Sequence, residues 1–115
     1  TQESVVSTGF PIDKDRNPDN NLDNLARILP MVRGVRRQGS AAFDLCCVAA
    51  GILDGYWEFN LNLWDVCAGI LIVTEAGGTV RSFREDRNVS IVAGPPAIVE
   101  QLYPRLSDKP GKICL

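Results

Sequence analysis

Two carboxylate residues, Glu58 and Asp65, lie seven positions apart around a short polar stretch. The residue pattern predicts that Glu58 ends an aromatic strand and that Asp65 stands in the first turn of the next helix. A carboxylate at such a loop–helix junction either complements the helix dipole, worth about 0.3–1 kcal/mol, or binds a hard cation such as Mg²⁺. One carboxylate does not make a metal site, and Glu58 is its nearest acidic neighbour in the sequence.

Strands and helices are expected to alternate along the chain. Runs rich in β-branched or aromatic residues predict strands over 4–8, 35–38, 56–59 and 89–93, with another beginning at 79–80. Periodic apolar residues predict helices over 20–32, 40–52 and 64–76 and a last one from 96 to 103. The 40–52 and 64–76 helices are apolar on nearly every side, Asp44 excepted, so we expect both to be buried against the sheet. The order predicts a single α/β domain over 1–115, with about five strands flanked by helices.

The composition fits one globular domain. The chain has 115 residues, of which 45% are hydrophobic and 23% charged. Its net charge of −2 argues against a dedicated nucleic-acid binder. No apolar run approaches the ~20 residues of a membrane span. The sequence has no histidine, which excludes Ser-His-Asp and Cys-His catalysis and any histidine-ligated zinc or haem site in this chain.

The cysteines and tryptophans are expected to be core residues. No C-x-x-C pair occurs among Cys46, Cys47, Cys67 and Cys114, and most have apolar neighbours, so we expect small core side chains in a reducing compartment. Trp57 and Trp64 are likewise expected to pack in the core. No signal peptide is visible, and a cytoplasmic location is expected. The first residue, Thr1, suggests a piece of a longer protein.

A small basic cluster has two open interpretations. Arg33, Arg36 and Arg37 fit a solvated sheet edge or subunit interface, or a contact to phosphate or an acidic partner.

Four segments resemble the inositol monophosphatase family. Residues 63–78 are similar to its C-terminal signature, W-D-x-x-A-G-x-x-I/L-x-x-E-A-G-G. Residues 36–42 resemble the segment R-x-x-G-S/T-A-A, and 48–58 resemble V-A-x-G…D-x-x-x-E. Residues 8–11 read T-G-F-P, as in bacterial members. The resemblance covers nearly the whole chain in the right order.

The resemblance implies a Mg²⁺-dependent, lithium-sensitive phosphomonoesterase with a layered αβαβα fold. It implies that Asp65 is a metal ligand and that Glu58 contacts hydroxyls of an inositol phosphate or similar sugar phosphate. It also implies that Gly39, Ser40 and Ala41 line the sugar pocket and that the protein is a homo-oligomer such as a dimer. We therefore expect the Asp65 carboxylate to point into a crevice shared with Glu58 and Ser40.

The sequence departs from the family in two ways. Asn60 and Asn62 stand where many members have a glycine and a basic or histidine residue, which leaves inositol itself open as the substrate. The family's upstream glutamate and D-P-x-D-G-T-x-N motif do not occur in the chain. We expect an inactive C-terminal half with an apolar face for the missing N-terminal half. The alternative is a non-catalytic interaction module, like the extragenic suppressors that act through transcription or RNA processing.

Overall fold

The computed structural model describes residues 3–9, 21–83 and 89–106. Its strands are β1 (Val5–Thr8), β2 (Gly34–Arg36), β3 (Gly55–Leu61), β4 (Thr79–Ser82) and β5 (Val89–Gly94). Its helices are α1 (Leu22–Ile28), α2 (Ala41–Ala49), α3 (Leu63–Glu75) and α4 (Pro96–Leu102), with short 3₁₀ turns η1 (Leu29–Met31) and η2 (Tyr103–Arg105). The elements follow one another in the expected order.

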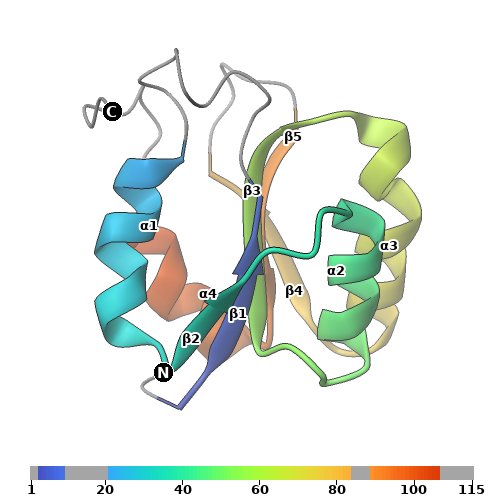
Figure 1. The fold of residues 1–115 in the computed structure, drawn as a ribbon. Helices are drawn as coiled ribbons and strands as arrows, with labels where there is room; N and C mark the ends of the chain where they lie inside the picture. Colours follow the sequence, from blue (N-terminus) through green and yellow to red (C-terminus); the bar gives the residue numbers. More distant parts are fainter. Residues whose placement is uncertain (1–2, 10–20, 84–88, 107–115) are drawn as a thin grey trace.

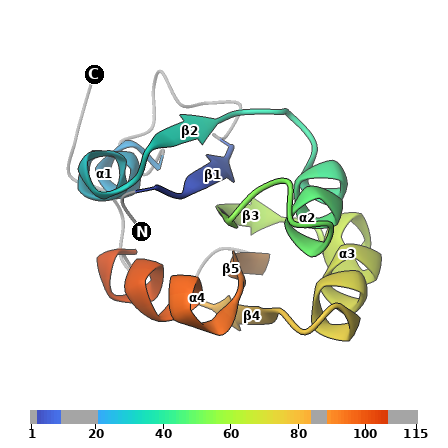
Figure 2. The same cartoon turned by 90° about the horizontal axis from the view of Figure 1, so that it is seen from below.

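The strands form one mixed sheet in the order β2-β1-β3-β5-β4. The strands β2, β1 and β3 run parallel, whereas β5 is antiparallel to both of its neighbours. Helices α1 and α4 cover one face of the sheet, and α2 and α3 cover the other (Figures 1 and 2). The prediction of an α/β fold with five strands flanked by helices is confirmed. At the upper edge in Figure 1, the carboxyl ends of β1 and β3 lie beside the amino ends of α2 and α3.

The two faces of the sheet carry separate cores because side chains alternate along a strand. Tyr56 of β3 packs under α2 and α3, and its neighbour Trp57 packs under α1 and α4. Both aromatic side chains are fully buried. The next position on the face of Tyr56 is Glu58, so the alternation in β3 aims that carboxylate toward the α2–α3 side.

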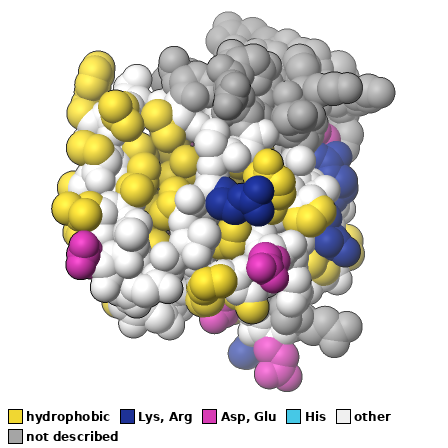
Figure 3. All heavy atoms as spheres, turned by 180° about the vertical axis from the view of Figure 1, so that it is seen from behind, with side chains coloured by type: hydrophobic (Ala, Val, Ile, Leu, Met, Phe, Trp, Pro, Cys, Tyr) yellow, Lys and Arg dark blue, Asp and Glu magenta, His cyan; other side chains and the backbone are white. Residues whose placement is uncertain are grey.

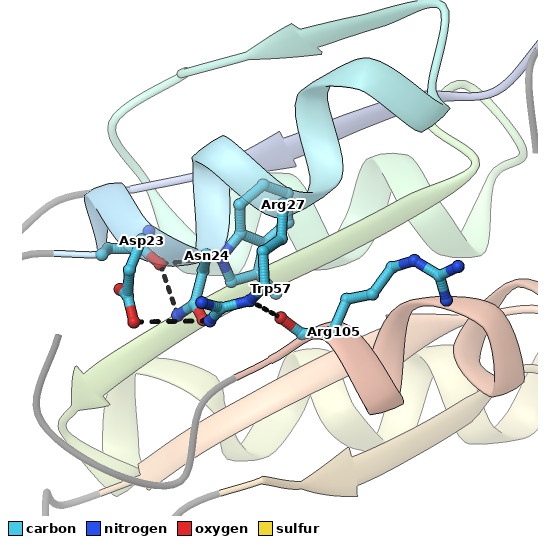
Figure 4. Close-up of polar contacts among 6 residues, drawn as sticks. Asp23, Asn24, Arg27, Trp57 and Arg105 are labelled. Carbon is cyan, nitrogen blue, oxygen red and sulfur yellow. Dashed lines mark hydrogen bonds and ion pairs between the residues drawn. The ribbon is translucent and has the colours of Figure 1, made fainter. Parts of the chain in front are cut away.

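Arg27 ties α1 to the turn η2 (Figure 4). Its Nη2 donates to Asn24 Oδ1 at 2.6 Å and pairs with Asp23 Oδ2 at 3.3 Å. Its Nε donates to the backbone oxygen of Arg105 at 2.5 Å. These contacts join segments far apart in the sequence on the face opposite α2 and α3.

Gly69 lets α2 and α3 approach closely. A Cβ atom at Gly69 would lie 2.7 Å from Cδ1 and 2.8 Å from Cβ of Leu45, whose side chain is fully buried. The glycine of the W-D-x-x-A-G pattern therefore has a packing role in this helix pair.

We expect Gly69→Ala to destabilise the chain by about 1–3 kcal/mol, as overpacking does. The helix-propensity gain of about 1 kcal/mol offsets only part of this clash, because the Leu45 Cβ atom is attached directly to the backbone. Urea unfolding measures the loss. The matched test is a double-mutant cycle with Leu45→Gly, which removes the Cβ, Cγ and Cδ1 atoms that the added methyl would meet, so the cost of the methyl should shrink. An equal cost in both backgrounds would contradict the packing explanation.

The burial expected for both apolar helices in the full assembly is only partly present for α3 in this chain. Within α3 only Val66, Gly69 and Val73 are buried. Trp64, expected in the core, is 79% exposed. The reason is that α3 has α2 and the sheet on one side and no described element on the other.

In α2 a polar side chain is buried and a large apolar side chain is exposed, which is the opposite of the burial expected from their residue types. Asp44, the single polar exception in an apolar run, is only 1% exposed, while Phe43 is 55% exposed. Of the cysteines, Cys47 is buried as expected, but Cys46 and Cys67 are exposed. Cys114 lies outside the described residues.

The element boundaries differ from the expected ones by a few residues. The α1 helix ends at Ile28, because Pro30 turns the chain into η1. The β3 strand runs on to Leu61, and α3 begins at Leu63, which leaves Asn62 as the sole connecting residue. Residue 20 of the helix expected over 20–32 and residues 10–11 of the T-G-F-P segment lie outside the described residues. Within the described ranges, no helix combines the length and the apolar character needed to span a bilayer.

Candidate active site

Glu58 is held in place by its neighbour two residues earlier on the same face of β3. The Tyr56 hydroxyl donates a hydrogen bond to Glu58 Oε1 at 2.6 Å. The Tyr56 side chain is fully buried, whereas Glu58 is half-buried. A rigid aromatic residue therefore fixes one carboxylate oxygen and leaves the other available to a ligand.

Gly9 makes room for this carboxylate. A Cβ atom at Gly9 would lie 2.5 Å from Oε1 and 2.7 Å from Oε2 of Glu58. Since real Cβ atoms do not approach oxygens so closely, any side chain here would displace the Glu58 carboxylate. The glycine of the T-G-F-P segment thus belongs to the candidate site.

The buried side-chain amide of Asn21 holds the Gly9 backbone in place. Asn21 donates from Nδ2 to the Gly9 oxygen at 2.7 Å and to Thr8 Oγ1 at 2.8 Å. Its Oδ1 accepts from Trp57 Nε1 at 2.8 Å and from Asn24 Nδ2 at 3.0 Å. The amide therefore uses both its donors and accepts twice, although it is fully buried. Asn21 also has a positive φ of 74°, a conformation that asparagine tolerates better than most residues.

The surroundings of Glu58 include some groups that raise the pKa of its carboxyl and others that lower it. Burial raises the pKa of Glu58, and Asp44 adds to that rise whenever Asp44 is ionised. The hydrogen bond from Tyr56 and the charge of Arg37 lower the same pKa. Burial is the largest cause of a raised pKa for Tyr56 as well, so its hydroxyl keeps its proton and acts as a donor.

Asp44 lies on the same side of the sheet as Glu58. It stands in the first turn of α2, and its Oδ1 lies 3.0 Å from Ser7 Oγ of β1. Burial raises the pKa of Asp44, and the Ser7 hydroxyl lowers it in part. Asp44 and Glu58 are therefore two carboxylates on the same side of the sheet, close enough for each to affect the pKa of the other.

The predicted pocket segment forms the start of α2. Ser40 is the N-cap, and its Oγ accepts a hydrogen bond from the Phe43 amide at 3.3 Å. Gly39 precedes it with a φ of 81°, which favours glycine. Gly39 and Ser40 are exposed, and Ala41 is half-buried. The Ser40 hydroxyl hydrogen remains available because the cap uses only an oxygen lone pair.

Asp65 is exposed in the first turn of α3. Its Oδ2 accepts a hydrogen bond from Asn62 Nδ2 at 3.4 Å, and within residues 3–9, 21–83 and 89–106 it forms no ion pair. Its position between a strand end and a helix start is as predicted. The contacts of the described residues join Asp65 to Asn62 rather than to Glu58 or Ser40, so the shared crevice stays a prediction.

Glu58 lies in β3, Ser40 caps α2 and Asp65 stands in the first turn of α3, and these three elements are neighbours on one side of the sheet (Figure 1). Sequence reasoning did not assign roles to the residues that build the surroundings of Glu58, which are Ser7, Gly9, Asn21, Asp44 and Tyr56. Two signals were present: Tyr56 shares a strand face with Glu58, and Asp44 is a lone acid in an apolar helix. The contact of Gly9 with Glu58 had no local signal.

The described residues offer one suitable ligand for a hard cation but not a complete metal site. Asp65 offers an exposed carboxylate, the ligand type that Mg²⁺ prefers. In the part of the chain that the structure describes, no group of three or more acidic, cysteine or histidine side chains could hold a metal ion. Among the described residues, Asp65 can therefore supply a single ligand and not a complete metal site.

Comparison with known proteins identifies the family. The family model described as "Inositol monophosphatase family" matches residues 1–109. The chain is similar to an inositol-1-monophosphatase of Synechocystis sp., with 49% identity over 70% of this chain and 28% of that protein. It is also similar to a putative Nus factor SuhB of Neisseria meningitidis serogroup B, with 42% identity over 90% of this chain and 41% of that one.

Solved structures agree with the fold. The inositol monophosphatase of Anabaena (Nostoc) sp. superposes with a TM-score of 0.82 at 37% identity, covering 95% of this chain and 45% of that one. The extragenic suppressor protein suhB of Bartonella henselae superposes with a TM-score of 0.78 at 40% identity, covering 90% of this chain and 41% of that one. The chain belongs to the inositol monophosphatase family, a family of metal-dependent phosphatases, and spans less than half the length of these relatives.

Proposed function

We propose that the chain is the substrate-side half of a Mg²⁺-dependent phosphomonoesterase that hydrolyses an inositol phosphate or a similar sugar phosphate. The observation that carries this proposal is the fixed carboxylate of Glu58 in the middle of β3, which Tyr56 binds and Gly9 accommodates. A purely structural strand has no need of a half-buried carboxylate packed on a glycine backbone. Family membership and the position of Asp65 support the same function.

In this proposal most of the site residues bind the substrate, and Asp65 binds the metal ion. Glu58 accepts hydrogen bonds from hydroxyl groups of the sugar, since its pair with Tyr56 occupies one oxygen and leaves the other. Ser40 contributes a hydroxyl donor, and Gly39 and Ala41 shape the pocket beside it. Asp65 is one ligand of Mg²⁺, which when bound neutralises charge on the phosphate oxygens and lowers the pKa of an attacking water. The remaining ligands come from an N-terminal half, which carries the upstream acidic motif.

We propose that this N-terminal half docks on α2 and α3. These two helices and the turn that follows α2 expose large apolar side chains: Phe43, Ile52, Leu63, Trp64, Leu71 and Ile72. Figure 3 shows hydrophobic side chains gathered on the side of the molecule where α3 lies. An apolar surface of this kind is typical of an interface. It also predicts self-association of the isolated chain, and a homo-oligomer remains part of the proposal.

Fragment complementation tests the proposed function. The chain alone is expected to release no phosphate from inositol monophosphate, because one aspartate cannot hold Mg²⁺ tightly. Mixing it with a separately purified N-terminal half of a close relative is expected to restore Mg²⁺-dependent release. The control mixture contains the chain carrying Glu58→Gln, which should raise KM. Robust turnover by the chain alone, or none by any mixture that demonstrably docks, would contradict the proposal.

A second candidate function is supported by the same apolar side. The chain could be a non-catalytic protein-interaction module, as some of its relatives are named Nus factors. In that case the apolar side of α2 and α3 is a partner-binding surface, and Glu58 and Asp65 have no chemical task. The two candidates differ in one measurement: Asp65→Asn leaves a protein-binding module intact but inactivates an enzyme.

A further inference from the structure

The Ser7 hydroxyl lies between two oxygen atoms that compete for one hydrogen. Ser7 Oγ is 3.1 Å from the backbone oxygen of Arg36 and 3.0 Å from Asp44 Oδ1. A hydroxyl has one hydrogen to donate, and both a carbonyl oxygen and an ionised carboxylate can only accept. If Asp44 were ionised, one of these two short oxygen–oxygen contacts would lack a hydrogen of its own. If Asp44 is protonated, Asp44 donates to Ser7 and Ser7 donates to Arg36, and both contacts are satisfied.

The surroundings of Asp44 favour the neutral form. Its side chain is 1% exposed and Ser7 is fully buried, so water does not solvate a charge there. In the described ranges Asp44 forms no ion pair. Burial raises the pKa of Asp44 above its ordinary value. The ionisable groups on the neighbouring elements are Tyr56 and Glu58 of β3, the exposed Arg36 and Arg37 at β2, and the exposed Asp65, Cys67 and Glu75 of α3.

Two nearby carboxylates do not both ionise readily in a buried setting. Glu58 is the better placed of the two to hold the charge. It is half-buried, accepts a 2.6 Å hydrogen bond from Tyr56, and has the charge of Arg37 near it. Asp44 has one neutral hydroxyl and the amino end of α2 in place of these contacts. These differences favour Glu58 over Asp44 as the group that holds a single negative charge on the pair.

We propose that Asp44 is a positioning residue that stays a neutral acid at neutral pH and donates its proton to Ser7, which donates in turn to Arg36. This chain of hydrogen bonds ties the first turn of α2 to β1 and to the end of β2. It fixes the Gly39–Ser40–Ala41 segment and leaves Glu58 as the single charge beside it. The link to substrate binding rests on the proposed function, whereas the protonation of Asp44 does not.

A protonated Asp44 makes the free energy of unfolding depend on pH, and the direction of this dependence can be worked out. The unfolded chain releases the Asp44 proton near the ordinary pKa of about 3.9, and the folded chain keeps it to higher pH. Between these two values the folded state binds more protons, so stability falls as pH rises. Glu58, whose pKa is also raised, contributes in the same direction. Asp44→Asn removes the contribution of Asp44 and should flatten the fall.

The experiment combines NMR with three variants of the 115-residue chain. The ¹³C carboxyl shift of Asp44 is expected to be that of a protonated acid at pH 7. Asp44→Asn, which keeps an N–H donor for Ser7 and has no proton to release on unfolding, should raise the urea midpoint at pH 7, while Asp44→Ala, which lacks the donor, should unfold at a clearly lower urea concentration than Asp44→Asn. Glu58→Gln is the control, since it removes the contribution of Glu58 and leaves the Asp44 shift protonated. If the isolated chain precipitates, the same labelled chain is measured in complex with the N-terminal half.

An ionised Asp44 at pH 7, with a single Ser7 hydrogen shared between two acceptors, would overturn the proposal. So would an Asp44→Asn variant that unfolds as easily as Asp44→Ala. In the complemented enzyme, Asp44→Ala is expected to raise KM several-fold with a smaller effect on kcat, and Asp44→Asn should restore KM. A protonated Asp44 in a protein without phosphatase activity would refute the proposed function and leave this inference standing.

Discussion

Asp65→Asn is expected to lower the turnover of the complemented enzyme by about 100-fold or more at ordinary Mg²⁺ concentrations, equivalent to about 3 kcal/mol of transition-state stabilisation. An amide is a poorer ligand than a carboxylate for a hard cation. Folding should change little, because Asp65 is exposed and makes one long hydrogen bond to Asn62. Phosphate release over a Mg²⁺ series measures the effect, and excess Mg²⁺ should recover part of the lost rate.

The matched control for this variant is Glu100→Gln. Glu100 is an exposed carboxylate on α4, on the face of the sheet opposite α3 (Figure 2). It changes the net charge by the same amount as Asp65→Asn and should leave turnover and Mg²⁺ dependence unchanged. Near-normal turnover of Asp65→Asn at ordinary Mg²⁺ would remove Asp65 from the list of metal ligands.

The second large effect concerns docking of the N-terminal half. Leu71 is 60% exposed and Ile72 is 45% exposed on the outer side of α3. Changing both to glutamate places two charges where an apolar contact is proposed, and each lost side-chain burial costs about 1.5–3 kcal/mol before any charge is desolvated. We expect the double variant to weaken docking by at least about 100-fold and to abolish complementation. It should also make the isolated chain monomeric.

Sedimentation and titration calorimetry measure self-association and docking of this double variant. Gln101→Glu on α4 is the control, because Gln101 is exposed on the opposite face and the change also adds a negative charge. Docking of the Leu71→Glu, Ile72→Glu chain with unchanged affinity would show that the N-terminal half binds elsewhere. Soluble monomers of the unchanged chain would show that this apolar side does not drive self-association.

The sequence by itself determined the elements and their order. The aromatic run predicted a strand over 56–59, and β3 covers it because β-branched and aromatic residues favour the extended backbone locally. The residue pattern placed Asp65 in the first turn of a helix, where the structure has it.

Burial and the surroundings of Glu58 were decided only by the tertiary structure. An apolar helix face is buried only if another element covers it, so the sequence could not distinguish buried Val66 from exposed Trp64. The buried Asp44 depends on Ser7, which is 37 residues away in sequence and brought near by the pairing of β1 with β2 and β3. Gly9 meets the Glu58 carboxylate because β1 lies beside β3 in the sheet. Such contacts depend on which strands become neighbours, and local residue preferences do not encode that choice.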